Sequence, residues 1–379
     1  MTKMVLREDF IQKIQSAFEI TPICALLGPR QCGKTTLSRI YAQNIKGPVH
    51  ILDLEDPGAL ARLENAKLVL ESLEGFIIID EVQLRPELFP LLRVLVDNSP
   101  QKFLILGSAS PELIRNSSET LAGRITYIEM TPFSLPEVHD WRRLWERGGY
   151  PRSYLAPTFH VSQGWRMGFI NTFLEKDIPQ LGFEIAPAKI RRFWMMLAHY
   201  HGGIFNASEI GASLDMTHKT VKHYLDILEG TYMMRRLNPW FENIGKRQVK
   251  SPKVYFRDSG LFHSLLSIEN EDDFLRHPKL GVSFEGFALE EVARFHQTDP
   301  QDCYFWRTQQ GAELDLLILK RGQKLGFEIK YTDRPKLSKS MQIALEDLKL
   351  DKLTVIVPGT IQFPLAEKIE VCGLERYVG

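Results

Sequence analysis

The chain has 379 residues, of which 44% are hydrophobic and 25% are charged, a composition typical of a globular protein with about two to three domains. Its 47 basic residues balance its 47 acidic residues, so affinity for nucleic acid would require a local basic patch. No apolar run approaches the ~20 residues of a membrane span, the amino terminus lacks a secretory signal pattern, and the four cysteines lack metal-binding spacing. We therefore expect a cytoplasmic protein that has reduced thiols and no membrane partner.

The first motif is a phosphate-binding loop. Residues 28–35 fit the pattern G-x-x-x-x-G-K-[ST], and they join an apolar run at 23–27 to a helical stretch at 36–43, which is the strand, loop and helix order that a P-loop requires. Backbone N–H groups of such a loop, with the helix amino terminus, bind a phosphate chain. Lys34 is expected to reach the β- and γ-phosphates of ATP or GTP, and Thr35 to bind Mg²⁺. The predicted nucleotide-binding residues are Gly28, Pro29, Arg30, Gln31, Cys32, Gly33, Lys34, Thr35 and Thr36.

Two further apolar runs end in polar residues. The run at 76–79 ends in Asp80 and Glu81, as expected of a Walker B strand that is buried on both faces of a parallel sheet. We expect Asp80 to support Mg²⁺, and Glu81 to orient or deprotonate the attacking water. The run at 103–106 leads to Ser108, which is either a sensor of the γ-phosphate or only the start of a turn.

The order of these motifs, followed by Leu121, Ala122, Gly123 and Arg124, resembles the AAA+-type ATPase module of a widespread bacterial and archaeal family. That family continues into a winged helix and a restriction-endonuclease-like domain. The resemblance implies an α/β fold with the P-loop strand central in a parallel sheet, and a homo-oligomer. It also implies that Arg124, after a helix-like stretch at 111–122, is an arginine finger acting on a neighbouring subunit. An exposed arginine favoured by a helix terminus is the alternative.

The turn cluster Gly148, Gly149, Tyr150 and Pro151 is the clearest boundary signal in the chain. It predicts an AAA+-like P-loop ATPase core at 1–150 and a helical lid at 151–205. A winged helix-turn-helix at 206–260 and a PD-(D/E)XK nuclease-like α/β domain at 261–379 would follow.

A helix-turn-helix pattern lies in the third of these regions. Ser208 is expected to cap a short helix at 209–214, and Thr217 a longer one that stops at Gly230; strands at 231–234 and 253–256 would then form the wing. From position 219 to 260 there are nine basic and four acidic residues, a net charge of +5, which is typical of a nucleic-acid-binding surface. The predicted DNA contacts are Lys219, Lys222, Lys246, Arg247 and Lys250. A winged helix that docks a protein is the alternative.

The last region carries a pattern of acidic residues on a predicted hairpin. Strands at 313–319 and 324–330 are separated by a turn, and two registers are open: Asp315 faces either Glu328 or Lys330. In both registers the three residues share one face of the ribbon. Like charges that face each other destabilise a sheet, so a divalent cation such as Mg²⁺ or Mn²⁺ between the carboxylates is the expected explanation.

This D…E-x-K arrangement resembles the PD-(D/E)XK nuclease motif, which binds the metal that hydrolyses a phosphodiester. Residues 303–306 resemble the first core strand of that fold, and Glu285 would open the helix that often adds another acid. The resemblance implies a nuclease site made of Glu285, Asp315, Glu328 and Lys330.

Together these patterns predict an ATP- and Mg²⁺-dependent ATPase that binds and remodels or processes DNA, including branched DNA, with a metal-dependent nuclease site. Two alternatives stay open. One is a nucleotide-gated DNA-binding regulator whose nuclease domain is silent. The other is a protein-assembly ATPase in which the winged helix docks a partner.

Overall fold

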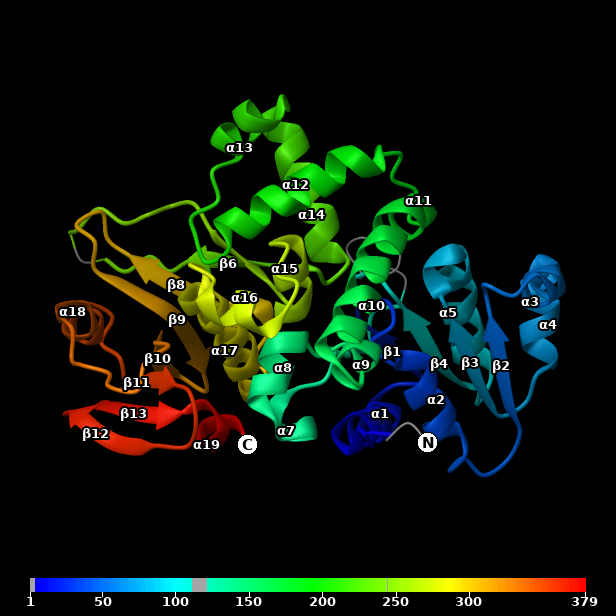
Figure 1. Ribbon diagram of the computed structural model, residues 1–379. Helices are drawn as coiled ribbons and strands as arrows, with labels where there is room; N and C mark the ends of the chain where they lie inside the picture. Colours follow the sequence, from blue (N-terminus) through cyan, green and yellow to red (C-terminus); the bar gives the residue numbers. More distant parts are fainter. Residues whose placement is uncertain (1–3, 111–120, 244) are drawn as a thin grey trace. The chain divides into compact units, whose positions relative to one another are not determined.

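The computed structural model describes residues 4–110, 121–243 and 245–379 and forms two compact units, each built from separate stretches of chain (Figure 1). The first unit comprises Met1–Pro132, Thr172–Ile185 and Asp226–Met233, and the second comprises Phe133–Asn171, Ala186–Leu225 and Met234–Gly379. The chain thus divides differently from the four consecutive domains expected, because two short segments return to the first unit. Most of the helix-like stretch expected at 111–122 lies outside the described residues. Within the described ranges, no helix has the length and apolarity needed to span a membrane.

The first unit is built on a five-stranded parallel sheet with the order β2-β3-β4-β1-β5. All residues of β1 and β3 are buried, as expected for a parallel sheet that is covered on both faces. The predicted strands at 23–27, 76–79 and 103–106 are confirmed, and the P-loop strand lies inside the sheet between β4 and β5. The strands are β1 (Ile23–Leu27), β2 (Val49–Asp53), β3 (Phe76–Asp80), β4 (Lys102–Gly107) and β5 (Ile125–Glu129).

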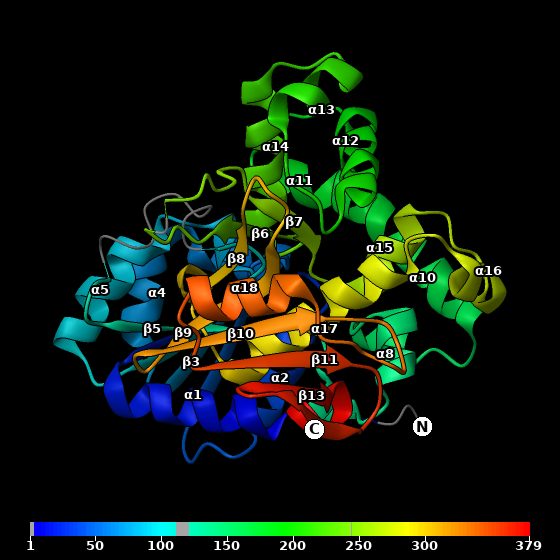
Figure 2. The same cartoon turned by 90° about the vertical axis from the view of Figure 1, so that its left-hand side faces the viewer.

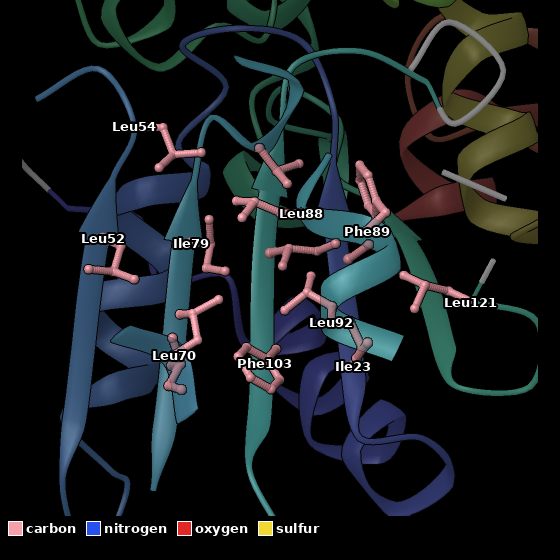
Figure 3. Close-up of a cluster of buried hydrophobic side chains, with 14 of the residues drawn as sticks. Ile23, Leu52, Leu54, Leu70, Ile79, Leu88, Phe89, Leu92, Phe103 and Leu121 are labelled. Carbon is pink, nitrogen blue, oxygen red and sulfur yellow. The ribbon is translucent and has the colours of Figure 1, made fainter. Parts of the chain in front are cut away.

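Alternate side chains of these strands enter two separate cores. On one face Ile79 and Phe103 pack with Leu88 and Leu92 of α5 (Figure 3). On the other face, Ile78 and its neighbours pack against α1 and α2. This division follows from the two-residue period of a strand. The covering helices are α1 (Glu8–Ile20) and α2 (Lys34–Ala42) on one face, and α3 (Pro57–Arg62), α4 (Ala66–Ser72) and α5 (Leu88–Asn98) on the other.

The second unit contains an eight-stranded mixed sheet with the order β12-β13-β11-β10-β9-β8-β6-β7. Figure 2 shows α18 (Lys339–Asp347) beside β10, and its Met341 and Ala344 are buried against Leu353 and Val355 of β11. The strands are β6 (Met234–Pro239), β7 (Lys253–Phe256), β8 (Cys303–Arg307), β9 (Glu313–Lys320), β10 (Gln323–Ile329), β11 (Lys352–Val357), β12 (Gln362–Ala366) and β13 (Ile369–Gly373).

The hairpin of β9 and β10 adopts the first of the two predicted registers. Its two turn residues, Arg321 and Gly322, have φ angles of 51° and 78°, as a type I′ turn requires. The ladder begins where Gln323 pairs with Lys320 and runs to the pair of Phe327 and Leu316. One further step in this register sets Asp315 opposite Glu328.

Two helices occur where the helix-turn-helix was expected, α13 (Ala207–Leu214) and α14 (His218–Gly230). Thr217 Oγ1 accepts a hydrogen bond from Thr220 N at 3.1 Å, so the predicted cap of α14 is confirmed. The predicted cap of α13 is wrong: Asn206, not Ser208, accepts the bonds from the first turn. The two residue types are similarly suited to this position.

The expected wing is not a separate hairpin. Residues 231–233 form a turn, and β6 pairs antiparallel with β7 on one side and parallel with β8 on the other. Every residue of β7 is buried, so these strands form one edge of the eight-stranded sheet. An apolar run cannot by itself distinguish a wing from a sheet edge.

The remaining helices lie in the second unit or in the returning segments. In the segment 172–185, the π-helix Phe173–Asp177 and α11 (Ile178–Gln180) continue from α10. The others are α7 (Leu135–Val138), α8 (Trp141–Arg147), α9 (Pro151–Tyr154), α10 (Phe159–Thr172), α12 (Pro187–Tyr200), α15 (Ser259–Leu265), α16 (Glu271–Arg276), α17 (Leu280–His296) and α19 (Leu374–Val378).

The packing of α5 gives a first prediction. Leu92 is fully buried in the core shown in Figure 3, so Leu92→Ala should lower the free energy of unfolding of the first unit by about 2–5 kcal/mol. Urea unfolding measures this change. Val94→Ala on the same helix is the control, because Val94 is 40% exposed and its loss should cost no more than about 0.5 kcal/mol. Equal effects of the two changes would contradict the packing of α5.

Candidate functional site

The P-loop follows the carboxyl end of β1, and glycine is required at two of its positions. A Cβ atom on Gly28 would lie 2.0 Å from Met130 O, and Gly33 has a φ of 108°, a conformation that glycine adopts without strain. Helix α2 begins directly afterwards, at Lys34. The loop therefore leads into a helix amino terminus, which favours anions.

The Lys34 side chain is buried and held by the loop itself. Its Nζ donates to Gly28 O at 2.8 Å and to Pro29 O at 2.9 Å. Hydrogen bonds from an ammonium to charged phosphate oxygens are stronger than those to neutral carbonyls. Lys34 is thus in position to exchange these carbonyl partners for a phosphate chain.

Thr35, in the first turn of α2, and Asp80, the last residue of β3, are joined by a hydrogen bond. Thr35 Oγ1 donates to Asp80 Oδ2 at 2.7 Å, and Glu81 N donates to Asp80 Oδ1 at 2.9 Å. Burial raises the pKa of Asp80, while the bond from Thr35 opposes that rise. A hydroxyl and a carboxylate side by side next to a phosphate-binding loop fit the oxygen ligands that Mg²⁺ prefers.

Glu81 belongs to a triangle of polar side chains with Gln83 and Ser108. Gln83 Nε2 donates to Glu81 Oε2 and, at 2.8 Å, to Ser108 Oγ, while Ser108 Oγ lies 3.2 Å from Glu81 Oε2. Ser108 N also donates to Gln83 Oε1 at 3.2 Å. Ser108 therefore does more than begin a turn. The sequence analysis predicted no role for Gln83. Its position two residues after Glu81 was the one feature of the sequence that could have indicated this contact.

The Arg30 side chain points to acidic groups from two other segments. It forms ion pairs with Glu55 and with Asp177 of the π-helix, and it donates to Gln180 Oε1 at 3.3 Å. Arg30, Ser108 and Asp177 line one solvent-open recess. The P-loop is thereby tied to the returning segment 172–185, a link that the motif did not indicate.

The other predicted loop residues differ in exposure. Gln31 is exposed and has a φ of 62°. Cys32 is buried, with its Sγ donating to Met130 O at 3.5 Å. Thr36 is exposed on the first turn of α2.

Arg124 is not near the P-loop of its own chain. It immediately precedes β5, and Ile23 N donates to Arg124 O at 3.1 Å, so it lies at the amino-terminal edge of the parallel sheet, opposite the loop after Leu27. Its guanidinium binds both carboxylate oxygens of Asp97, at 2.6 and 2.9 Å. A role as an arginine finger would require release from Asp97.

The basic stretch at 219–260 is less exposed than its charge suggests. Arg235, Lys253 and Arg257 are in buried or nearly buried ion pairs. Of the predicted DNA contacts, Lys246 pairs with Asp347 at 2.6 Å. The four that remain exposed are Lys219, Lys222, Arg247 and Lys250. The net charge of a stretch of sequence does not reveal which of its side chains form ion pairs in the folded protein. Fewer basic side chains of the stretch 219–260 are therefore free to contact DNA than its net charge of +5 suggests.

The predicted acidic residues of the second unit lie in one cluster, together with a lysine that sequence reasoning did not place there. Lys253 Nζ lies 2.5 Å from Glu313, 3.6 Å from Glu285 and 3.9 Å from Asp315. Burial alone would lower the pKa of Lys253, but these carboxylates raise it above its ordinary value. Glu285 lies inside α17 rather than at its start, and its Oε1 accepts from Tyr255 OH at 2.7 Å.

Glu328 and Lys330 form the other side of this cluster. Lys330 Nζ lies 2.7 Å from Glu328 Oε1, whereas Glu328 Oε2 is buried and has no hydrogen-bond partner in the described part of the chain. Asp315 Oδ2 accepts from Ile329 N at 2.9 Å. Burial, followed by the charge of Asp315, raises the pKa of Glu328 to about 8 and that of Glu285 to about 7.

The divalent cation expected between Asp315 and Glu328 stays a prediction. Among the described residues, no three His, Cys, Asp or Glu side chains are placed to hold a metal ion. The lysine ammonium groups instead supply the positive charge near the carboxylates. Lys253 is far away in sequence and was counted with the basic stretch, so only the three-dimensional fold reveals it.

The Glu81 triangle gives the second prediction. Gln83→Ala should reduce ATP turnover about 10- to 100-fold, as the loss of an orienting partner does elsewhere, with nucleotide affinity unchanged within about twofold. Steady-state turnover and calorimetric binding separate the two effects. Gln180→Ala in the same recess is the control, since Gln180 contacts Arg30 but has no hydrogen bond to Glu81. Unchanged turnover in Gln83→Ala would show that Glu81 needs no such partner.

Comparison with known families divides the chain into three consecutive matches. Residues 21–139 match an AAA domain, residues 138–272 match a domain of unknown function (DUF8612), and residues 280–377 match a second domain of unknown function (DUF4143). The AAA match covers the five-stranded sheet from β1 to β5. The first unit is therefore an AAA-type P-loop ATPase fold.

Two solved structures show weak similarity to the chain. The Walker-type ATPase PABY2304 of Pyrococcus abyssi is 16% identical, with a TM-score of 0.48 over 69% of this chain and 96% of that one. The Aeropyrum pernix ORC1 protein in complex with DNA is 12% identical, with a TM-score of 0.35 over 73% and 94%.

Two relatives are much more similar. They are the uncharacterized proteins Mb2031c of Mycobacterium bovis and Rv2008c of Mycobacterium tuberculosis, each 47% identical over 370 residues, which is 97% of this chain and 83% of the relative. The chain belongs to the family of these mycobacterial proteins, and its first unit contains the AAA domain.

Proposed function

We propose that the chain is a Mg²⁺-dependent ATPase that binds DNA and uses ATP hydrolysis to remodel or process it. The AAA domain supports ATP hydrolysis. The observation that carries the assignment of residues is the pairing of Thr35 with Asp80 directly beside Glu81. This pairing supports a Mg²⁺ site formed by Thr35 of α2 and Asp80 of β3, with Glu81 beside it as the candidate general base.

Each residue would then have one role. Lys34 binds the β- and γ-phosphates, and Glu81 orients the attacking water, held in place by Gln83 and Ser108. Thr35 and Asp80 would hold Mg²⁺, which neutralises charge on the phosphates when it is bound. Arg124 of a neighbouring copy, once released from Asp97, would stabilise charge in the transition state.

The DNA part of the proposal is supported by α14. Lys219 and Lys222 are exposed near its amino terminus, where a recognition helix contacts a groove. At the other end of this helix, Gly230 O accepts a hydrogen bond from Ser110 N at 2.8 Å, two residues after Ser108. One helix thus connects exposed lysines with the loop that carries the candidate γ-phosphate sensor.

A nucleotide-gated DNA-binding regulator with a silent nuclease domain is the second candidate. It is favoured by the Lys253 ammonium among the carboxylates Glu285, Glu313 and Asp315. Incubation of the wild-type chain with duplex and branched DNA and Mg²⁺ tests it: intact DNA supports the regulator, and cleavage that Asp315→Asn abolishes supports the nuclease. If the chain binds no DNA even at low salt, a protein-assembly ATPase becomes the better account.

The third prediction separates nucleotide binding from hydrolysis. Lys34→Ala should weaken ATP binding about 10- to 100-fold because charge-assisted hydrogen bonds to phosphate are lost. Glu81→Gln should retain ATP binding and slow turnover by about 10²- to 10⁴-fold. Calorimetry with a slowly hydrolysed analogue and phosphate-release kinetics measure the two effects. If Glu81→Gln turns over ATP at the wild-type rate, Glu81 is not the base.

The fourth prediction tests the DNA surface through salt dependence. If Lys219 and Lys222 contact phosphates, changing both to Gln should flatten the slope of log K against log[salt] by about 1.8. Lys246→Gln is the matched control and should change the slope less, because the Lys246 ammonium already pairs with Asp347. Fluorescence anisotropy across a salt series measures these slopes. An unchanged slope in the double variant would exclude α14 from the DNA interface.

A further inference from the structure

The carboxylate cluster of the second unit contains its own cation. Four acidic side chains, Glu285, Glu313, Asp315 and Glu328, come from α17, β9 and β10, and Lys253 enters the cluster from β7. The Lys253 ammonium lies within 4 Å of three of these carboxylates. Since Lys253 is only 3% exposed, the surrounding protein largely shields these interactions from water.

We propose that the Lys253 ammonium is the resident cation of this cluster: it supplies the positive charge that a divalent metal ion supplies between nuclease carboxylates, and it excludes such an ion while it remains in place. This inference deepens the silent-nuclease candidate and rests on it. It does not depend on the ATPase assignment, because all of the residues involved belong to the second unit.

The contacts identify Lys253 rather than Lys330 as this cation. Lys330 has a side chain that is 46% exposed, and its ion pair is with Glu328, whereas Lys253 contacts Glu285, Glu313 and Asp315 together. Lys253 also packs over the Phe305 ring, with Nζ 5.6 Å from the ring centroid. Buried carboxylates without a cation are strongly unfavourable, so a positive charge at this position stabilises the folded cluster.

The unpaired Oε2 of Glu328 is an oxygen ligand that a metal ion could bind if the Lys253 ammonium were removed. Glu328 is only 6% exposed, and its Oε2 lacks a partner in the described part of the chain. The β9–β10 register sets Asp315 opposite this residue. Without the Lys253 ammonium, the two carboxylates would present hard oxygen ligands of the kind that Mn²⁺ accepts.

MnCl₂ added to the full, nucleotide-free chain tests the proposal, with bound Mn²⁺ measured by electron paramagnetic resonance and Tm by calorimetry. The wild type should have no Mn²⁺ site at Asp315. Asp315→Asn should therefore leave its Mn²⁺ binding unchanged. Lys253→Met should lower Tm, and Mn²⁺ should then bind at least about tenfold more tightly than to the wild type and restore part of the lost Tm. Adding Asp315→Asn to Lys253→Met should abolish this response.

Lys324→Met is the control for removal of a paired lysine, because Lys324 Nζ lies 2.5 Å from Glu242 Oε2 outside the cluster. It should give no gain in Mn²⁺ binding. The proposal is overturned if the wild type binds Mn²⁺ through Asp315, or if folded Lys253→Met gains no Mn²⁺ affinity.

Should Lys253→Met fail to fold, Lys253→Gln replaces it under the same two criteria, and the comparison of wild type with Asp315→Asn still decides whether metal is excluded. ATP turnover and DNA cleavage measured on the same samples report separately on the proposed function. Loss of either activity would leave the Mn²⁺ result interpretable on its own.

Discussion

The parallel alignment of β1, β3 and β4 is the constraint on which the nucleotide site depends. Parallel strands end at the same edge of a sheet, so the loops that follow them converge there. Three hydrogen bonds join the segments that follow these strands. They run from Gly28 N to Gly107 O at 3.1 Å, from Thr35 to Asp80 at 2.7 Å, and from Ser108 to Glu81 at 3.2 Å. Hydrophobic cores on both faces hold the strands in register, so the chemistry of the site depends on apolar packing elsewhere in the unit.

Two short segments connect this site with the rest of the chain. Residues 172–185 carry Asp177, which pairs with Arg30 of the P-loop, and residues 226–233 carry Gly230, which accepts from Ser110. Both segments belong to the first unit, while the residues that flank them belong to the second. The P-loop and the loop after β4 therefore contact stretches of chain that continue directly into the second unit, one of them through α14, which carries Lys219 and Lys222.

Features with local signals could be predicted from the sequence, and features that depend on distant partners could not. The buried strands and the P-loop follow from apolar runs and fixed spacing. The hairpin register was narrowed to two options, and the type I′ turn at Arg321 and Gly322 selects one. By contrast, the attachment of β6 and β7 to the larger sheet depends on pairing with β8. Lys253 was counted among the basic residues of the stretch 219–260. Its carboxylate partners lie more than 30 residues away in the sequence, so no local pattern indicates that they surround it.

Phosphate release from ATP by the purified full chain tests whether Thr35, Asp80 and Glu81 form a Mg²⁺-dependent ATP-hydrolysing site. Turnover is measured with Mg²⁺ and again after chelation of all divalent cations. We expect turnover that disappears on chelation and returns when Mg²⁺ is restored. Turnover that persists without divalent cations, or no turnover in either condition with or without DNA, would contradict this assignment.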